Sequence, residues 1–270
     1  MKRLTSSLLI GLGLALGISN GSLLAQPKAE FKTFTEWCEN KNQLAEETQH
    51  TIEVLLTEVG TTDCNRAEQI LSSSRWLDLT SNEIRDITPL SSLTQLQSLD
   101  LGYNQVTDFT PLSSLTQLTA LALYDNQITD LSSLSSLTQL THLYLNGNEI
   151  KDITPLSSLT QLAILSLAGN EISDISPLSS LVQLVYLELG YNEINDIKPL
   201  SSLVQLVYLD LNGNQISDIS PLSPLTQLTE LNLVSNQVRD ISPLSSLAQL
   251  ADLDLSGNEI SDISPLSSQG

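Results

Sequence analysis

The sequence has few aromatic and few basic residues. Aromatic residues make up 4% of the 270 positions, and 11 Lys and Arg face 31 Asp and Glu, which gives a formal net charge of -20. A chain this acidic argues against nucleic acid and anionic membranes as partners, because both carry charge of the same sign. Basic proteins, cations and neutral glycans remain as ligand classes.

Histidine and cysteine are also scarce, with only His50, His142, Cys38 and Cys64. The sequence contains no glycine-rich phosphate loop and no His-Glu-x-x-His spacing. The usual side-chain sets for nucleophilic, metal and nucleotide chemistry are therefore incomplete. We expect a protein that is not an enzyme and that uses no cofactor and no metal.

Long hydrophobic runs are absent. The longest begins at Leu8 and ends at Ile18, well short of the roughly 20 apolar residues that cross a bilayer. Lys2 and Arg3 precede this run and small residues follow it up to Ala25, a pattern typical of a secretory signal peptide. We therefore predict a signal peptide over residues 1–25, no stable membrane insertion, and a secreted, periplasmic or cell-surface location.

The two cysteines have a clear expectation in an exported protein. Export favours a disulfide between Cys38 and Cys64, and two free buried thiols are the alternative. The loop that this bond closes would contribute about 3.5 kcal/mol in the chain-entropy view of disulfides.

A repeat of 22 residues occupies the chain from Leu77 onward. One unit, from Leu96, is LQSLDLGYNQVTDFTPLSSLTQ. The alternation around Leu99 and Leu101 predicts a short strand, and Pro111 with the spaced leucines after it predicts a tight 3₁₀ turn. The pattern L-x-x-L-x-L-x-x-N is that of leucine-rich repeats. Such a unit buries its apolar side chains only by stacking on neighbours, so residues 75–270 should form one solenoid of about nine repeats.

Residues 77–266 also follow the pattern DIxPLxxLxxLxxLxLxxNxI, which resembles the 22-residue repeats of the bacterial internalin family. The resemblance implies an α/β-type leucine-rich repeat solenoid with a parallel β-sheet on the concave face and short 3₁₀ turns on the convex face. It also implies an asparagine ladder that bonds backbone inside each turn, and a concave face that binds protein partners. The residues after the last repeat contain no immunoglobulin-like domain or wall-binding tail, so we do not expect covalent wall anchoring.

The segment before the repeats, residues 26–74, is predicted to be a helical N-terminal cap. Ile52, Leu55, Leu56 and Val59 share one helical face, Gly60 ends that helix, and Asp63 begins another. Such a cap would cover the first strand, whose apolar side chains and backbone would otherwise face water.

Two further ladders are assigned to structure. An Asp stands four residues after each repeat Asn and would cap the following turn, whereas a calcium ladder is disfavoured because the repeats lack Gly-rich Asp loops. The Asn side chains would satisfy backbone groups that the turns leave open. The ladder consists of Asn82, Asn104, Asn126, Asn148, Asn170, Asn192, Asn214, Asn236 and Asn258.

The positions marked x in x-L-x-L-x-x-N, four per repeat, are predicted to be strand residues that point outward. They form the candidate ligand-binding surface. They hold all six tyrosines of the chain and no Lys or Arg. Strand propensity for Tyr and the need for a soluble surface are the alternative explanations. The aromatic candidates are Trp76, Tyr103, Tyr124, His142, Tyr144, Tyr186, Tyr191 and Tyr208. The acidic residues are Asp78, Asp100, Asp125, Glu188, Asp210, Glu230, Asp252 and Asp254.

Rigid aromatic side chains among carboxylates suit a basic protein surface. The sequence therefore favours an exported protein-binding module that recognises a protein partner with a basic contact surface. A glycan-binding surface protein and a structural envelope protein without a specific ligand are the alternatives.

Overall fold

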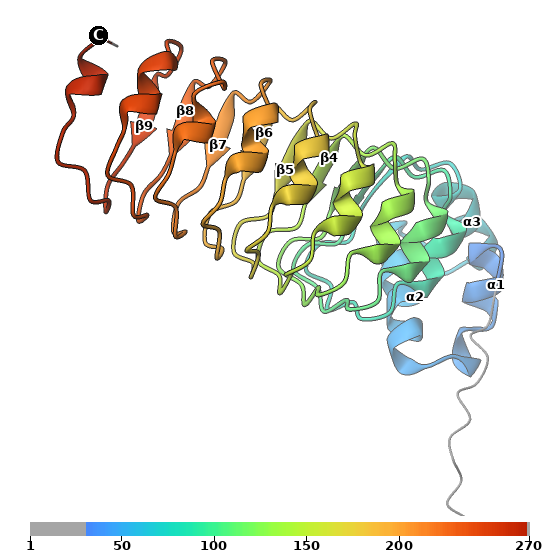
Figure 1. Ribbon diagram of the computed structural model, residues 1–270. Coiled ribbons are helices and arrows are strands. Elements are labelled where there is room, and N and C mark those ends of the chain that lie inside the picture. Colours follow the sequence, from blue (N-terminus) through green and yellow to red (C-terminus); the bar gives the residue numbers. More distant parts are fainter. Residues whose placement is uncertain (1–30, 269–270) are drawn as a thin grey trace, which may run out of the picture. The chain divides into compact units, whose positions relative to one another are not determined.

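The computed structural model describes residues 31–268, so the predicted signal peptide, residues 1–25, lies outside the described residues. The described residues belong to one compact unit of the chain. In it, parallel strands lie side by side in chain order in a single open sheet, and the predicted repeat fold is confirmed (Figure 1). The strands are β1 (Trp76–Asp78), β2 (Ser98–Asp100), β3 (Ala120–Ala122), β4 (His142–Tyr144), β5 (Ile164–Ser166), β6 (Tyr186–Glu188), β7 (Tyr208–Asp210), β8 (Glu230–Asn232) and β9 (Asp252–Asp254).

A short 3₁₀ helix follows each strand, as the Pro-Leu turns predicted. The repeat Asp holds each of these turns: Asp240 Oδ1, for example, accepts the backbone N–H of Ser242 at 2.8 Å. A proline in the first turn adds a fixed φ in these 3₁₀ helices except η4, where Ser133 replaces it. The 3₁₀ helices of the repeats are η2 (Thr88–Ser92), η3 (Thr110–Ser114), η4 (Ser132–Ser136), η5 (Thr154–Ser158), η6 (Ser176–Ser180), η7 (Lys198–Ser202), η8 (Ser220–Leu222), η9 (Ser242–Ser246) and η10 (Ser264–Ser268).

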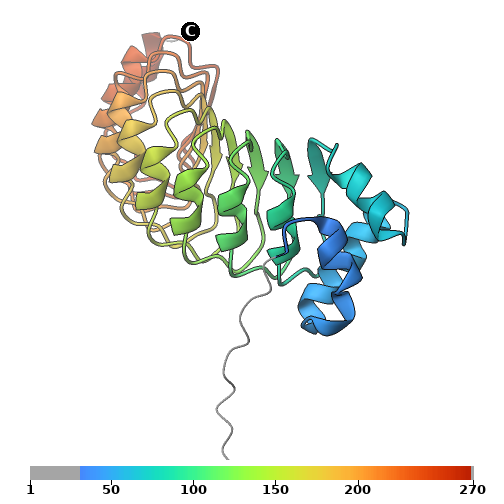
Figure 2. The ribbon, with the colours of Figure 1, turned by 90° about the vertical axis from the view of Figure 1, so that its right-hand side faces the viewer.

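Neighbouring strands pair without any shift in register, so equivalent residues of successive repeats lie beside one another. Leu165 on β5 is opposite Leu143 on β4 and Leu187 on β6. These leucines are fully buried in one continuous core. Within this unit, the strands lie on the inner side of the curved row of repeats and the 3₁₀ helices on its outer side (Figure 2).

The asparagine ladder joins neighbouring turns as well as closing each one. Asn170 Nδ2 donates to the carbonyls of Leu167 in its own turn and Leu145 in the preceding turn, both at 3.0 Å. Its Oδ1 accepts the N–H of Ile150 in the preceding repeat, also at 3.0 Å. The ladder thus goes beyond the expected bonding inside each turn. The seven Asn from Asn104 to Asn236 are buried, and Asn82 and Asn258 at the ends are partly buried.

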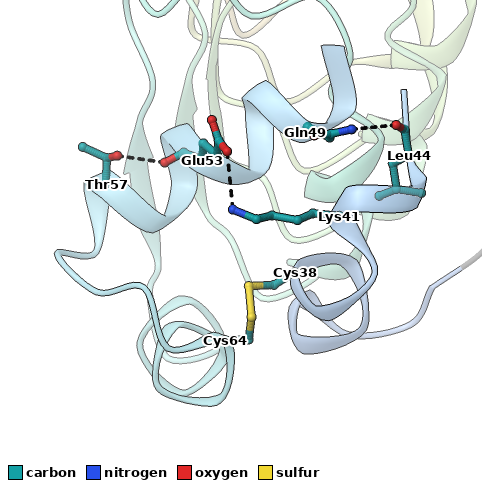
Figure 3. A network of polar contacts seen from close by, with 7 residues as sticks. All are labelled: Cys38, Lys41, Leu44, Gln49, Glu53, Thr57 and Cys64. Atoms are coloured by element: carbon teal, nitrogen blue, oxygen red, sulfur yellow. Dashed lines mark hydrogen bonds and ion pairs between the residues drawn. A yellow bond between two sulfur atoms is a disulfide. The ribbon is translucent and has the colours of Figure 1, made fainter. Parts of the chain in front are cut away.

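Three α-helices precede the repeats: α1 (Phe34–Glu39), α2 (Glu46–Glu58) and α3 (Cys64–Leu71), with a short η1 (Lys41–Gln43) after α1. The predicted helix signals are present, because Gly60 has a φ of +66° just after α2 and Asp63 Oδ1 accepts the N–H of Arg66 at 3.0 Å. The Cys38–Cys64 disulfide is confirmed, and it joins α1 to α3 (Figure 3). In the same view, Lys41 Nζ pairs with Glu53 on α2 at 3.4 Å.

The helices are bonded to the first repeat. Thr51 Oγ1 on α2 donates to the Asp86 carbonyl at 2.6 Å, and Thr48 Oγ1 donates to the Asp86 carboxylate. His50 Nε2 lies 2.7 Å from the Asn82 carbonyl oxygen. Phe34, Ile52 and Leu55 belong to the same buried core as the repeat leucines. Among residues 31–268, no helix has the length and apolar character needed to cross a membrane.

Candidate functional site

The strands are shorter than the sequence pattern suggested. Each has three residues, of which the first and third point away from the core. The expectation of four outward strand positions per repeat is therefore wrong: two are strand residues and two belong to the turn before the ladder Asn. Tyr103, Tyr124, Asp125 and Tyr191 are turn residues. We call the two outward strand residues and the two turn residues of every repeat, taken together, the strand face.

The second turn residue has a left-handed backbone in every repeat. Its φ runs from +50° at Asp125 to +70° at Gly257, and four repeats have glycine there. Tyr103 and Tyr191 occupy this position with φ of +53° and +55°. The left-handed region costs a non-glycine residue about 1–2 kcal/mol and is unusual for a bulky one. The two side chains are 58% and 70% exposed, so neither burial nor backbone preference accounts for tyrosine at these positions.

Tyr103, Tyr124 and Tyr144 form an N-terminal tyrosine cluster. The rings of Tyr103 and Tyr124 meet edge to face with centroids 5.2 Å apart. A Cβ at Gly102 would stand 2.2 Å from the Tyr124 ring, so glycine there lets the ring lie across the neighbouring turn. Partial burial and the nearby Asp100 carboxylate raise the pKa of Tyr124. The cluster, Asp100 and Asp125 line a shallow, open hollow.

Tyr186 and Tyr208 form a second aromatic group. Their rings stack with centroids 4.2 Å apart and planes 6° from parallel. The Tyr186 hydroxyl donates to Glu188, whose other carboxylate oxygen accepts the Ser166 hydroxyl at 2.6 Å. Partial burial, followed by the Glu188 carboxylate, raises the pKa of Tyr186, and burial raises the pKa of Tyr208. Both hydroxyls therefore stay protonated at neutral pH.

The other aromatic candidates are spread along the face. The Tyr191 ring lies beside Gly213, where a Cβ would meet it at 2.8 Å. Trp76 on β1 is 68% exposed. His142 is partly buried, with Nδ1 2.8 Å from the Thr141 hydroxyl. The repeat that contains β5 contributes only small or aliphatic side chains to the strand face and separates the two aromatic groups; these are Ile164, Ser166, Ala168 and Gly169.

Several acidic candidates have a structural role that the sequence interpretation missed. Asp78, Asp100, Asp210 and Asp254 each accept the backbone N–H of the residue two positions later, at 2.8–3.0 Å. This bond closes the turn that follows the strand. The signal was present, because Asp or Asn recurs at this strand position. Glu230 and Asp252 are exposed first residues of their strands, and Asp125 extends toward Gly147.

The strand face carries carboxylates and no Lys or Arg. Over residues 31–268, the ion pairs lie elsewhere: Lys41–Glu53, Lys151–Glu171, Lys198–Asp196 and Arg239–Glu259. No group of three or more His, Cys, Asp or Glu within the described part of the chain is placed to hold a metal ion. The face therefore offers unpaired negative charge and aromatic area to a ligand.

Comparison with known proteins agrees with this geometry. The family described as "Leucine Rich repeats (2 copies)" matches residues 75–114, 116–158, 138–180, 160–202, 182–224 and 226–268. No curated protein matches the chain.

Solved structures with similar folds include two internalins of Listeria monocytogenes. One, inlF, is 33% identical with a TM-score of 0.71, and the match covers 85% of this chain and 74% of that one. The other, inlC2, is 32% identical with a TM-score of 0.64, and the match covers 81% and 88% of the two chains. The Arabidopsis receptor kinase HAESA, solved with a peptide hormone and a co-receptor, is 25% identical with a TM-score of 0.62 over 68% of this chain and 34% of that one. The chain belongs to the leucine-rich repeat proteins, and within them it is of the internalin type.

Proposed function

We propose that this protein is an exported binding protein that holds a protein partner on its strand face. The observation that carries the proposal is the pair of exposed tyrosines, Tyr103 and Tyr191, at left-handed backbone positions. Unfavourable backbone geometry without compensating burial is common where a residue serves a ligand. Tyrosine suits such a contact, because it supplies a large rigid surface at low entropy cost.

The size of the strand face fits a protein partner. Strands about 4.8 Å apart place nine of them across ~40 Å, which is enough for the roughly 800 Å² that one partner buries in a standard interface. The kinship with HAESA, which was solved with a peptide hormone, supports a protein or peptide as the class of ligand. Catalysis plays no part in this proposal.

A basic contact surface on the partner follows from the charge of the strand face. Glu188, Asp210 and Glu230 lie on three adjacent strands, and none of them is in an ion pair with Lys or Arg of the described chain. Complementary charge would speed association and orient the partner on the face.

The test is affinity capture from the native medium or envelope with the immobilised full chain. Tyr103→Gly combined with Tyr191→Gly should lose the captured partner, because glycine keeps the left-handed turn and removes only the rings. Gln127→Ala combined with Gln215→Ala, two exposed residues outside the strand face, is the matched control and should retain it. A partner that the double glycine variant still captures would refute the proposal.

A glycan ligand is the second candidate, since exposed rings such as Tyr103 and Tyr191 can also stack on sugars. A carbohydrate array separates the two. Glycan signals that the unaltered chain gives and the double glycine variant loses would identify the ligand as a glycan instead of a protein. An array without signals would exclude the glycan candidate.

Export itself belongs to the proposal. We assign residues 1–25 to a cleaved signal peptide, residues 26–74 to a cap and residues 75–270 to the repeat domain. Mass spectrometry of the chain recovered outside the cytoplasm should give a mature N-terminus near Gln26. An uncleaved chain that stays in the cytoplasm would contradict the assignment.

A further inference from the structure

Four exposed valines stand out from an edge of the solenoid where the other repeats carry Thr, Gln or Ala. Eight large hydrophobic residues are exposed in the part of the chain that the structure describes, and four of them are valines of two adjacent repeats. Val182, Val185, Val204 and Val207 are 44%, 40%, 46% and 37% exposed. We call them the valine patch. They lie at two equivalent positions, between the 3₁₀ helix of one repeat and the strand that follows.

The fold does not need valine at either position. At the first, other repeats have Thr94, Thr116, Thr138, Thr160, Thr226 and Ala248. At the second they have Gln97, Thr119, Thr141, Ala163, Thr229 and Ala251. Where threonine occupies the second position, its hydroxyl donates to a backbone carbonyl of the preceding repeat, at 3.1 Å from Thr119, 3.0 Å from Thr141 and 3.2 Å from Thr229. Threonine at the second position would therefore donate to the same backbone carbonyl. The valines make no such bond and leave apolar surface exposed to water.

The valine patch lies beside the aromatic stack of the strand face along the chain. The backbone N–H of Val207 donates to the Val185 carbonyl at 2.9 Å, so the two valines are direct neighbours. Each immediately precedes one ring of the stack, Val185 before Tyr186 and Val207 before Tyr208. Val185 and Val207, which are exposed, are therefore directly followed by Tyr186 and Tyr208, the first residues of β6 and β7. The carboxylates of Glu188 and Asp210 stand at the other ends of these two strands.

We propose that the valine patch and the Tyr186–Tyr208 stack together dock a basic amphipathic segment of the protein partner. Apolar side chains of that segment would cover the valines, and its Lys or Arg side chains would face Glu188, Asp210 and Glu230. The juxtaposition of apolar edge and uncompensated carboxylates carries this assignment, which rests on the proposed function. A second copy of this strand face is disfavoured as the occupant, because it would bring carboxylates against carboxylates. An anionic lipid surface is disfavoured for the same reason.

The test uses a random peptide library displayed on phage and the immobilised full chain. The variant replaces Val182, Val185, Val204 and Val207 by threonine, the residue that sister repeats carry. Thr116→Ser combined with Thr138→Ser changes the same edge in repeats without valines and is the control. Peptides selected by the unaltered chain should combine Leu or Phe with Lys or Arg. Synthetic versions should bind the four-threonine variant about tenfold more weakly in calorimetry, as expected for the loss of buried apolar area.

Each other result overturns the inference. Equal affinity for the unaltered chain and the four-threonine variant would show that the valines do not contact the segment. Self-association in analytical ultracentrifugation that the four threonines abolish would assign the patch to a second copy. Binding to phosphatidylcholine and phosphatidylglycerol vesicles that the four threonines abolish would assign it to lipid. A library that yields no valine-dependent peptide would refute the docking proposal. The proposed function fails separately, when the Tyr103→Gly and Tyr191→Gly variant keeps its partner.

Discussion

Replacing Tyr191 by alanine and by glycine should produce a different order of stability from the same two substitutions at Tyr186. The two tyrosines belong to one repeat and differ in backbone conformation. Tyr191 has a φ of +55°, whereas Tyr186 is the first residue of strand β6. We expect glycine to be the more stable replacement at position 191 and alanine to be the more stable one at position 186.

The magnitude follows from the two backbone states. At position 191, alanine must adopt the left-handed region at a cost of about 1–2 kcal/mol, whereas glycine adopts it freely. The greater freedom of glycine in the unfolded chain offsets roughly 0.5–1 kcal/mol of that gain. At position 191, the free energy of unfolding of the Gly variant should therefore exceed that of the Ala variant by about 1 kcal/mol. In the strand at position 186 only the unfolded-state effect applies, and Gly should be the weaker variant by about 0.5–1 kcal/mol.

Urea unfolding at 25 °C, followed by circular dichroism, measures both pairs. Within each pair the lost ring is the same, so its packing on Gly213 or Tyr208 cancels. Comparing the four midpoints therefore isolates the backbone. If alanine were the more stable replacement at both positions, the turn at position 191 would carry no strain, and the main argument for a binding role of Tyr191 would be lost.

Three further predictions concern the scaffold. Asn170→Ala should lower the free energy of unfolding by about 3 kcal/mol, because the buried Ile150 N–H loses its partner and the carbonyls of Leu145 and Leu167 each lose one of their two amide donors. Cys38→Ser combined with Cys64→Ser should cost about 3.5 kcal/mol of stability in urea unfolding, since the bond closes a loop with a sequence separation of 26. Hydrogen bonds from the backbone N–H and hydroxyl groups of Ser220, Ser242 and Ser264 lower the pKa of Asp218, Asp240 and Asp262 below 3.8. Their contribution is complete above the unfolded-state pKa and is lost as the pH falls through the lower folded-state values, so urea midpoints should decline below about pH 4.

Each of these has a matched control. Asn146→Ala removes a partly buried amide of the strand face and should lower the free energy of unfolding by under about 1 kcal/mol. An equal loss of stability at Asn146 and Asn170 would contradict the prediction that the ladder asparagines stabilise the fold more than other asparagines do. Reduction of the unaltered chain should reproduce the effect of the double serine variant, and a reduced chain that unfolds at the same urea concentration would contradict the disulfide prediction. Replacing Asp218, Asp240 and Asp262 together by Asn keeps a side-chain oxygen acceptor without a charge that titrates. A variant whose midpoint fell with pH as steeply as that of the unaltered chain would exclude these carboxylates as the cause.

The sequence predicted the repeat architecture because every level of it carries the same 22-residue period. Leucines at fixed spacing predict which side chains pack inward. The Asn and Asp that recur in every repeat, such as Asn170 and Asp240, stand where the backbone of the turns needs a hydrogen-bond partner. The candidate surface was predicted as the set of residues that the repeat pattern does not place in the core. The repeat pattern does not distinguish strand residues from turn residues. Tyr103 and Tyr191 were therefore predicted to lie in strands, which in the structure end three residues earlier.

The sequence by itself determined the fold, the inward leucines, the disulfide pair and the acidic, aromatic character of one face, because these depend on local spacing and on composition. Only the tertiary structure decided how residues a full repeat apart meet. Stacking without a register shift brings Tyr186 onto Tyr208 and places Asn170 between two turns. The left-handed φ of Tyr191 is likewise set by the turn that stacking imposes on each repeat. Contacts of this kind depend on the separation of neighbouring turns in space, which a linear pattern of residues does not contain.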